Sequence, residues 1–467
     1  MSKPANQHVD GNGLNGNGGA AKAEMLTLEA NAAAVEALSD YYAEPAWMRA
    51  ARRDAWAHYE RMDWPHTKEE AWRRLPLVRY PLENRQIAVA PNPLQALRSL
   101  PACWLSPLAP QPQVSGIVVH QNGAVAYQDI EAQAAKQGIV VMDLHAALHT
   151  HGDLIRRYWM QGTITRPDFN KFTALNAALW HGGTFVYVPE GARALRPLQA
   201  MVGYDDQGST GLHHTLVVVE KGARLTLIQD RRSLEFLPEL NSEMVEIYAE
   251  EGAWVRYVSL QHWGEQRHSV SVQNARVARD AHLLWVNVAL GGQMTKDFLR
   301  TDLLAPGAHG VMQGLTFAAK EQIMDQSTYQ LHQAPDTYSD LLFRNVLRDQ
   351  AKTVFYGMIR VEPGAQGTQG YQANNNLLLG KARAHAIPGL EIAANDVRCS
   401  HGATVSRLDE EQLFYLQARG IARYDAEQLL VQGFLRPIIE RVPLACMRDG
   451  LDEEIAQRFR ESPAQTQ

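Results

Sequence analysis

A four-residue turn phrase built around glycine and alanine recurs through the middle of this chain and limits the folds open to it. The copies are Pro-Glu-Gly-Ala at 189–192, Glu-Lys-Gly-Ala at 220–223, Glu-Glu-Gly-Ala at 250–253, a degenerate Ala-Arg-Asp-Ala at 278–281, Ala-Pro-Gly-Ala at 305–308 and Glu-Pro-Gly-Ala at 362–365. Successive copies lie 27 to 31 residues apart, and the last interval of 57 residues equals about two steps. Such a repeat is typical of stacked units that cannot bury a hydrophobic face alone.

Short strand-like runs rich in β-branched and aromatic residues lie between these turns, at 184–188, 215–219, 224–228, 254–258 and 283–288. Propeller blades need about 40 to 50 residues each. The shorter step therefore favours a solenoid of β-coils, and we predict a β-helix core over residues 166–405. The glycines need no functional role, because a tight turn between coils requires a positive φ.

The chain before the repeats divides into two parts. Residues 1–24 are mostly Gly, Asn and Ala, have almost nothing to bury, and are expected to be a disordered tail. Residues 25–165 read as a helical or mixed domain. Its signals are a helical stripe at Trp47, Ala51, Ala55, Tyr59 and Met62, a capping box at Thr67 and Glu70, short strands at 114–119 and 138–141, and a helix at 144–160.

The chain after the repeats is expected to be a helical domain over residues 406–467. Asp409 followed by Gln412 is a capping box that predicts a helix over 410–419, which Gly420 would end. A second box at Asp425 opens another helix. That helix has a stripe of apolar residues at Leu430, Phe434 and Ile438, and Pro437 is expected to kink or end it.

Composition excludes several classes of protein. Of the 467 residues, 45% are hydrophobic, so a sizeable core is possible. The net charge of −6 argues against a main role in binding nucleic acid. No apolar run reaches the roughly 18 to 20 residues that cross a bilayer, and the first residues contain no secretory h-region. We expect a cytoplasmic protein that does not bind membranes.

Cysteine is scarce, since only Cys103, Cys399 and Cys446 occur. Three scattered cysteines fit a reducing cytosol. They also exclude a self-contained thiolate cage for zinc or an iron–sulfur cluster, which normally takes four ligands. Any metal chemistry must therefore use histidine, carboxylate or a partner's ligands.

Catalytic signatures are absent, because the chain contains no P-loop, no HExxH and no GxSxG motif. The adjacent His213 and His214 would point to opposite faces of a strand and cannot share a ligand from one side. In contrast, Cys399 and His401 would share a face, and a thiolate with an imidazole suits iron or zinc. Two other interpretations stay open: a buried cysteine beside a hydrogen-bonded histidine, and a Cys–His nucleophile pair without an orienting group.

The last third of the chain resembles the SufB/SufD family of the SUF iron–sulfur cluster assembly system. The phrases that carry the resemblance are Asn-Asn-Asn-Leu-Leu-Leu at 374–379, Pro-Gly-Leu-Glu-Ile at 388–392, Asn-Asp-Val-Arg-Cys-Ser-His-Gly-Ala-Thr at 395–404 and Leu-Asp-Glu-Glu-Gln-Leu-Phe-Tyr-Leu at 408–416. The similarity is strong over about 365–440 and weaker through the repeats and 67–72. The low cysteine count and the Cys-Ser-His-Gly-Ala-Thr phrase are closer to the SufD branch than to the SufB branch.

The resemblance implies a right-handed parallel β-helix between helical domains, in a non-catalytic scaffold subunit. It implies a SufB-like partner that pairs through the β-helix and a SufC-like ABC ATPase that docks on the C-terminal helices, with a homodimer when the chain is alone. Cys399 and His401 match family positions that hold a nascent iron–sulfur cluster transiently with the partner's ligands, so this chain alone would bind none stably. The residues that match the ATPase-docking helices are Phe414, Tyr415, Leu430 and Phe434, which could equally be helix-packing residues.

Two alternatives from other classes remain at this point. A carbohydrate-active β-helix enzyme would use paired carboxylates in a groove. A structural β-solenoid would instead associate with itself end to end. The Cys-x-His phrase argues against the first, and helical segments at both ends argue against the second.

Overall fold

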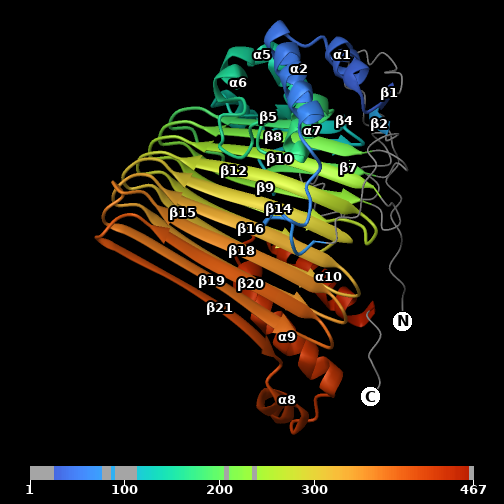
Figure 1. Ribbon diagram of the computed structural model, residues 1–467, viewed down its shortest axis with the longest axis vertical. Helices are drawn as coiled ribbons and strands as arrows, with labels where there is room; N and C mark the ends of the chain where they lie inside the picture. The colour runs from blue at the N-terminus through green and yellow to red at the C-terminus, as the bar shows by residue number, and fades with distance from the viewer. Residues whose placement is uncertain (1–25, 76–85, 90–112, 205–209, 234–238, 462–467) are drawn as a thin grey trace.

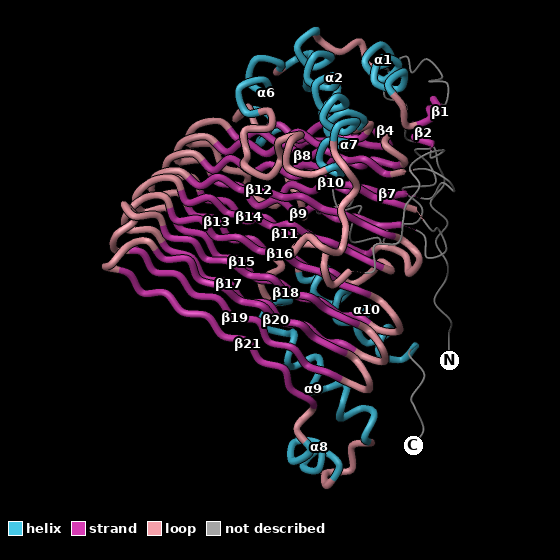
Figure 2. Tube along the Cα trace, viewed as in Figure 1, coloured by secondary structure: helices cyan, strands magenta, loops and turns pink. Residues whose placement is uncertain are grey.

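The structure is a computed structural model that describes residues 26–75, 86–89, 113–204, 210–233 and 239–461. Its centre is a β-helix in which two large sheets face each other and successive strands of the chain alternate between them (Figure 1). The helices lie toward the two ends of the chain, and most of them pack on the outside of the sheets, whereas the helix at 410–417 extends beyond the end of the rod (Figure 2). The predicted β-helix core with helical segments at both ends is confirmed.

The strands of the two sheets are parallel, apart from one antiparallel strand at the N-terminal end of each sheet. The nine-stranded sheet contains β5 (Val140–Asp143), β6 (Gly182–Val188), β8 (Gly211–Val219), β10 (Leu240–Ala249), β12 (His268–Val277), β14 (Met294–Leu303), β16 (Ile323–His332), β18 (Lys352–Val361) and β20 (Arg383–Ile392). The ten-stranded sheet contains β4 (Ala124–Ile130), β3 (Gly116–Gln121), β7 (Leu198–Tyr204), β9 (Arg224–Ser233), β11 (Trp254–His262), β13 (His282–Ala289), β15 (His309–Ala318), β17 (Tyr338–Leu347), β19 (Thr368–Leu378) and β21 (Val397–Arg407).

A column of left-handed residues runs along the turns that the repeated phrase predicted. Its members are Gly191, Gly222, Gly252, Asp280, Gly307, Asp336 and Gly367, whose φ angles lie between 54° and 74°. Each backbone N–H donates to a carbonyl of the next coil, as from Gly191 to Lys221 at 2.9 Å and from Gly367 to Asp396 at 2.7 Å. Asp336 therefore supplies the left-handed turn residue in the 57-residue interval between the last two copies of the repeated phrase. The expectation for the last copy was wrong, since Gly367 and not Gly364 takes the positive φ.

The interior of the β-helix is apolar on one side and polar on the other. Next to the turn column, buried aliphatic and aromatic side chains from both sheets interlock, among them Val245, Leu227 and Trp285. Toward the opposite turns the same strands turn polar side chains inward. There Arg231 forms a buried ion pair with Glu243 and a hydrogen bond to Ser259. Burial of apolar side chains therefore stabilises the interior next to the turn column, and hydrogen bonds and ion pairs satisfy the polar side chains in the interior near the opposite turns.

The N-terminal helices cover the outer face of the nine-stranded sheet. They are α1 (Ala32–Tyr41), α2 (Ala46–Arg61), α5 (Leu144–Thr150), α6 (Gly152–Tyr158) and α7 (Lys171–Leu179), while α4 (Ala132–Lys136) is a single short turn of helix. Residues of the predicted stripe on α2 are buried or half-buried against this core. The strands β1 (Leu26–Glu29) and β2 (Gln86–Val89) form a separate antiparallel pair.

Two local predictions in this region were wrong. The capping box at Thr67 and Glu70 opens no helix, because residues 67–75 form consecutive turns with bonds such as Trp72 N–H to the Glu69 carbonyl. The single helix expected over 144–160 is two short helices, α5 and α6, that meet at His151.

The C-terminal helices are α8 (Glu410–Gln417), α9 (Arg423–Ile439) and α10 (Ala445–Glu461). Asp409 caps α8 as predicted, and its carboxylate accepts from Glu411 N–H at 2.9 Å. The second helix begins at Arg423, two residues before the predicted start, and runs past Pro437 to Ile439. The sequence did not predict α10. Buried residues of α9 and α10 pack against the outer face of the ten-stranded sheet.

None of the helices in the described ranges combines the length and the apolar character that crossing a bilayer requires.

The turn column can be tested with two exposed glycines that differ in backbone conformation. Gly222 has a φ of 65°, Gly364 lies outside the left-handed region, and a Cβ at either position would meet no atom within 4 Å. We expect Gly222→Ala to destabilise the fold by about 1 to 2 kcal/mol, because an L side chain disfavours the left-handed conformation. Gly364→Ala should leave the urea midpoint unchanged or slightly raised. Equal effects of both substitutions would contradict the assignment.

Three buried histidines meet near the N-terminal end of the sheets. The rings of His120 and His213 lie 4.9 Å apart, and His181 is 1% exposed. Burial lowers the pKa of His181 to about 3 and lowers the pKa of His213 well below its ordinary value. The His181 and His213 side chains are therefore neutral in the folded protein at neutral pH.

Acid should weaken the fold through His181 and His213, whose pKa values burial lowers. Below pH 6.5 the unfolded chain binds a proton at His181 that the folded chain excludes down to about pH 3. Between pH 7 and pH 5 this one group removes about 2 kcal/mol from the free energy of unfolding. We expect His181→Gln to reduce that pH-dependent loss in urea denaturation. An identical loss in the variant and the parent would show that His181 does not contribute.

Candidate functional site

The C-terminal end of the β-helix is open. Strands β20 and β21 are the last strands of their sheets, and each pairs with only one neighbouring strand in the described structure. Nearly all of β21 is exposed, including Val405 at 53%, whereas alternate residues of the preceding strand β19 are buried. An exposed strand edge presents unpaired N–H and C=O groups that can pair with another chain. The open end is visible below β19 and β20 in Figure 1.

Cys399 and His401 lie on β21 at this open end. Cys399 is in register with Gly370 and His401 with Gln372 of β19. Alternate residues of a strand share a face, so both side chains point the same way, as predicted. That face looks toward the interior of the β-helix, because a Cβ at Gly370 would point at the Cys399 sulfur and because the Gln372 side chain is buried.

Gly370 leaves a space beneath the Cys399 thiol. A Cβ at this glycine would lie 3.4 Å from the Cys399 Sγ and 3.5 Å from the His332 Nε2. His332 is fully buried, and its two ring nitrogens bond to Thr337 and Ser339 at 2.8 and 2.9 Å. Burial lowers the pKa of His332 to about 4, so the imidazole is neutral at pH 7. Sequence reasoning missed this histidine, because its place depends on register across three strands.

The thiol and its surroundings set conditions for metal binding. Burial raises the pKa of Cys399, although the backbone N–H of Gly370 opposes that shift. The free thiol is therefore protonated at neutral pH, and a metal ion must displace its proton. Beneath His401, both polar side-chain atoms of the buried Gln372 lack a hydrogen-bond partner among the residues that the structure describes. An unsatisfied amide of this kind is costly, which favours a polar ligand or water in the space above it.

The pair is short of a complete metal site. In the described ranges, no group of three or more His, Cys, Asp or Glu side chains is arranged to hold a metal ion. A thiol and an imidazole supply two of the four ligands that an iron–sulfur cluster normally takes. No hydrogen bond to the His401 ring occurs within the described residues, so neither open alternative, a hydrogen-bonded histidine or an oriented Cys–His nucleophile, gains support there.

The other cysteines and the adjacent histidines lie elsewhere. Cys446 on α10 is half-buried and donates to Gln113 Oε1 at 3.4 Å, and Cys103 lies outside the described residues. His213 bonds to Thr184, whereas His214 bonds to Glu246 and stacks on Trp159. The two adjacent histidines therefore have different partners, as expected for neighbouring residues of a strand.

The four residues predicted to dock a partner fall into two groups. Phe414 and Tyr415 on α8 are 73% and 54% exposed. Leu430 is half-buried and, together with Tyr415, lines a surface pocket of about 460 Å³. Phe434 instead faces the ten-stranded sheet, where the Arg344 guanidinium lies 5.3 Å from its ring. Sequence reasoning missed Leu429, which is 49% exposed on the same helix.

Fold and site together define a β-helical protein whose open end carries an incomplete Cys–His pair. Comparison with known families agrees with the sequence resemblance. Residues 202–434 match the model for the SUF system FeS cluster assembly, SufBD core domain, and residues 36–200 match the SufBD protein N-terminal region. The chain belongs to the SufB/SufD family of iron–sulfur cluster assembly proteins.

Curated relatives support this placement. An iron–sulfur cluster assembly SufBD family protein of Staphylococcus saprophyticus is 27% identical over 416 residues, which cover 88% of this chain and 89% of the relative. The iron–sulfur cluster assembly protein SufB of Bacillus subtilis shows the same identity and coverage. A SufBD family protein of Staphylococcus epidermidis is 29% identical over 340 residues, or 72% of this chain and 73% of the relative.

The protonation state of Cys399 can be measured by alkylation. In a chain with Cys103→Ser and Cys446→Ser, we expect the rate of reaction with iodoacetamide to rise with pH and to reach half its maximum above pH 9, because burial raises the thiol pKa. Mass spectrometry of timed samples gives the rate. A rate that is already maximal at pH 8 would show that the thiol is not shielded.

Proposed function

We propose that this chain is a non-catalytic scaffold subunit of the SUF system, of the SufD branch, which supports iron acquisition and nascent cluster assembly. It pairs through the open end of the β-helix with a SufB-like paralogue and binds a SufC-like ABC ATPase through its C-terminal helices. Both partners and this chain work in the cytoplasm. The observation that carries the proposal is the exposed strand β21, which presents Cys399 and His401 at an unpaired sheet edge.

The pairing with a paralogue is supported by the state of the last coil. Its side chains Val405 and Ile392 are 53% and 41% exposed, so the hydrophobic interior of the rod ends without a cover. A second β-helix of similar cross-section would extend both sheets and bury these side chains. Backbone hydrogen bonds would supply affinity, and the side chains would supply specificity. A homodimer of this chain through the same edge follows when the paralogue is absent.

The site residues fit a shared ligand set. Cys399 and His401 offer one sulfur and one nitrogen, which suit iron, and the paralogue supplies the remaining ligands across the new sheet junction. His401 must be neutral and Cys399 deprotonated to ligate, so binding releases the thiol proton. The iron–sulfur cluster is cargo that forms at the interface and leaves it. This chain alone holds no cluster stably.

Assignment to the SufD branch is supported by cysteine usage. Only three cysteines occur in the chain, and of the two in the described residues it is Cys399 that lies beside a histidine on the same strand face. A scaffold that carried a complete cluster site would need more thiolates. In our proposal the cysteine-richer paralogue supplies them.

The C-terminal helices are built to pass a movement of the ATPase to the rod. Exposed aromatic rings on α8 offer a docking surface, with Phe414 at its centre. Polar contacts fix α9 and α10 to the ten-stranded sheet. Arg344 donates to the Phe434 carbonyl at 2.6 Å, Arg348 donates to the Phe459 carbonyl, and His262 pairs with Glu454 at 2.7 Å. A displaced helix would therefore pull on β17 and β11 rather than slide over them.

Alanine substitution of the two site residues tests the proposal. In the reconstituted complex with both partners, we expect Cys399→Ala and His401→Ala to lower cluster formation at least about tenfold, while the complex still assembles. Loss of one metal ligand typically costs far more than loss of an outer contact. Absorption spectra and bound iron and sulfide measure the cluster. Cys446→Ala is the matched control. Undiminished cluster formation in the double variant, with both Cys399 and His401 replaced by Ala, would contradict the site assignment but not the scaffold role.

Substitutions on α8 test the ATPase contact separately. We expect Phe414→Ala and Tyr415→Ala to weaken ATPase binding by about 1 to 3 kcal/mol, as for central aromatic contacts, with no change in paralogue pairing. The control is Leu195→Ala, since Leu195 is 65% exposed outside the C-terminal helices. Pull-down with the purified ATPase gives the readout. If the α8 variants retained as much ATPase as the parent chain does, the contact would not involve these α8 side chains.

A further inference from the structure

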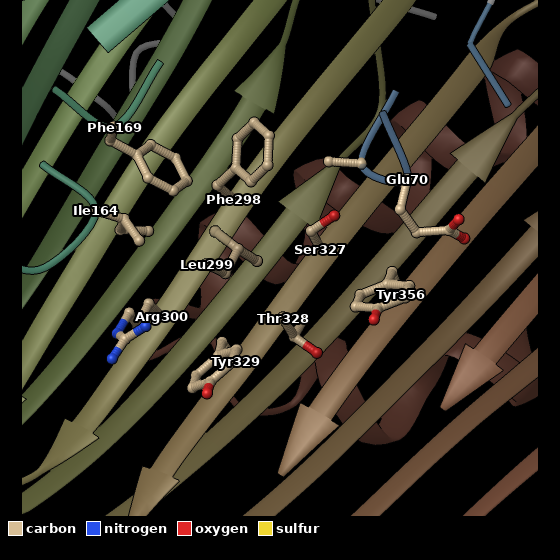
Figure 3. Close-up of a pocket in the computed structure, with 11 residues that line it drawn as sticks. Glu70, Ile164, Phe169, Phe298, Leu299, Arg300, Ser327, Thr328, Tyr329 and Tyr356 are labelled. Atoms are coloured by element: carbon tan, nitrogen blue, oxygen red, sulfur yellow. The ribbon is translucent and has the colours of Figure 1, made fainter. Parts of the chain in front are cut away.

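A cavity of about 360 Å³ opens on the outer face of the nine-stranded sheet, away from β21. Strands β14, β16 and β18 form its floor, and the segments around Glu70 and Phe169 form two of its walls (Figure 3). It shares no residue with the Cys399 site or with the α8 surface. A cavity of this size falls in the range of small-molecule sites.

The floor is shaped by one small residue between two aromatic rings. Phe298, Ser327 and Tyr356 are in register on three adjacent strands, so the serine leaves a slot between the rings. The Ser327 hydroxyl accepts from Lys296 Nζ at 2.8 Å, and Lys296 also pairs with Asp325 at 2.6 Å. The hydrogen bond from the buried Lys296 fixes the half-buried Ser327 hydroxyl, so the slot stays open.

Aromatic rings also form the sides of the slot. Phe169 meets Phe298 edge to face at 5.4 Å, and Tyr329 lies beside Arg300 at the far end of the cavity (Figure 3). Three rings beside the slot, with Tyr329 farther along the cavity, favour a flat ring system, because aromatic pairs gain from offset and edge-to-face contact.

Arg300 brings a guanidinium to the cavity, and one side of it forms an ion pair with Asp302. Its Nε donates to Asp302 at 2.6 Å, and its guanidinium lies 4.5 Å from the centre of the Tyr329 ring. Asp302 in turn accepts from Asn274 at 3.1 Å and Thr163 at 3.3 Å, which holds the arginine in place. Within the described residues the two terminal nitrogens of Arg300 have no acceptor. A guanidinium with two such donors binds an anionic group in a bidentate way.

The negative charge at the mouth does not oppose an anion strongly. Glu70 is the acidic residue that lines the cavity, and it pairs with Arg73 at 2.8 Å and with Arg74 at 3.0 Å. Its carboxylate is thus balanced by two neighbouring cations on the same turn segment.

We propose that this cavity binds a planar aromatic small molecule that carries an anionic group, with the rings in the slot above Ser327 and the anion on Arg300. The chemistry fits an aromatic carboxylate, phosphate ester or sulfonate of two or three rings. This binding goes beyond the scaffold role and does not depend on any partner subunit.

The test uses 8-anilinonaphthalene-1-sulfonate and its uncharged analogue N-phenyl-1-naphthylamine as probes on the isolated full chain. Fluorescence titration should show one site that prefers the sulfonate at least tenfold. Phe169→Ala should weaken both probes at least tenfold, and Arg300→Gln should abolish the preference for the sulfonate. Leu195→Ala, which removes an exposed apolar side chain that does not line the cavity, is the control and should change neither.

Hydrogen–deuterium exchange provides a second readout that does not depend on probe fluorescence. The sulfonate should slow exchange in residues 160–170 and 66–74, the two segments that wall the cavity, and only when Phe169 is present. Equal binding in Phe169→Ala and the parent chain, or protection confined to the C-terminal helices, would overturn the proposal. So would an equal affinity for the two probes in the parent chain.

Discussion

The backbone hydrogen-bond ladder between coils is the constraint on which the rest of this structure depends. The backbone N–H and C=O groups of every inner strand bond to one coil before it and one coil after it, as those of β10 bond to β8 and β12. Such a ladder has to stop at both ends. The backbone groups of an unpaired end cost free energy if they are buried, and they can pair with another chain if they are exposed. The N-terminal end is closed by the antiparallel strands β4 and β5 and by helices. The C-terminal end stops at β20 and β21, which remain exposed.

Function, in our account, follows from that asymmetry. A rod with one closed end and one open end pairs through the open end, and the residues on its last strand become interface residues. Cys399 and His401 are on that strand, with the space at Gly370 and the unsatisfied Gln372 amide directly beneath them. In a shared site each partner supplies only part of the ligand set, so two ligands from this chain are what such a site requires. The C-terminal helices, held by Arg344 and Arg348, join this rod to the exposed α8.

Patterns that depend on neighbouring residues could be predicted, and contacts between coils could not. The turn phrase predicted the solenoid because every copy repeats the same local geometry, and the i, i+2 spacing predicted that Cys399 and His401 share a face. The position of His332 beneath Gly370 depends on how β16 of one sheet packs against β17 and β19 of the other, which the sequence does not display. The capping box at Thr67 predicted a helix that does not form. The segment forms turns instead, and its Trp72 side chain packs against Phe298. Helix α10 was missed because no Ser, Thr, Asp or Asn precedes it as a cap, although Met447, Leu451, Ile455 and Phe459 form an apolar stripe in the sequence.

The measurement that tests the central claim most directly is the composition of the complex in cells. The chain should be purified with a mild tag from the organism that encodes it and weighed by native mass spectrometry. Our account predicts a defined complex with one copy of this chain, a cysteine-richer β-helical paralogue and an ABC ATPase, and no free β21 edge in exchange experiments. Recovery of the chain as filaments of itself, or as a monomer without either partner, would contradict it.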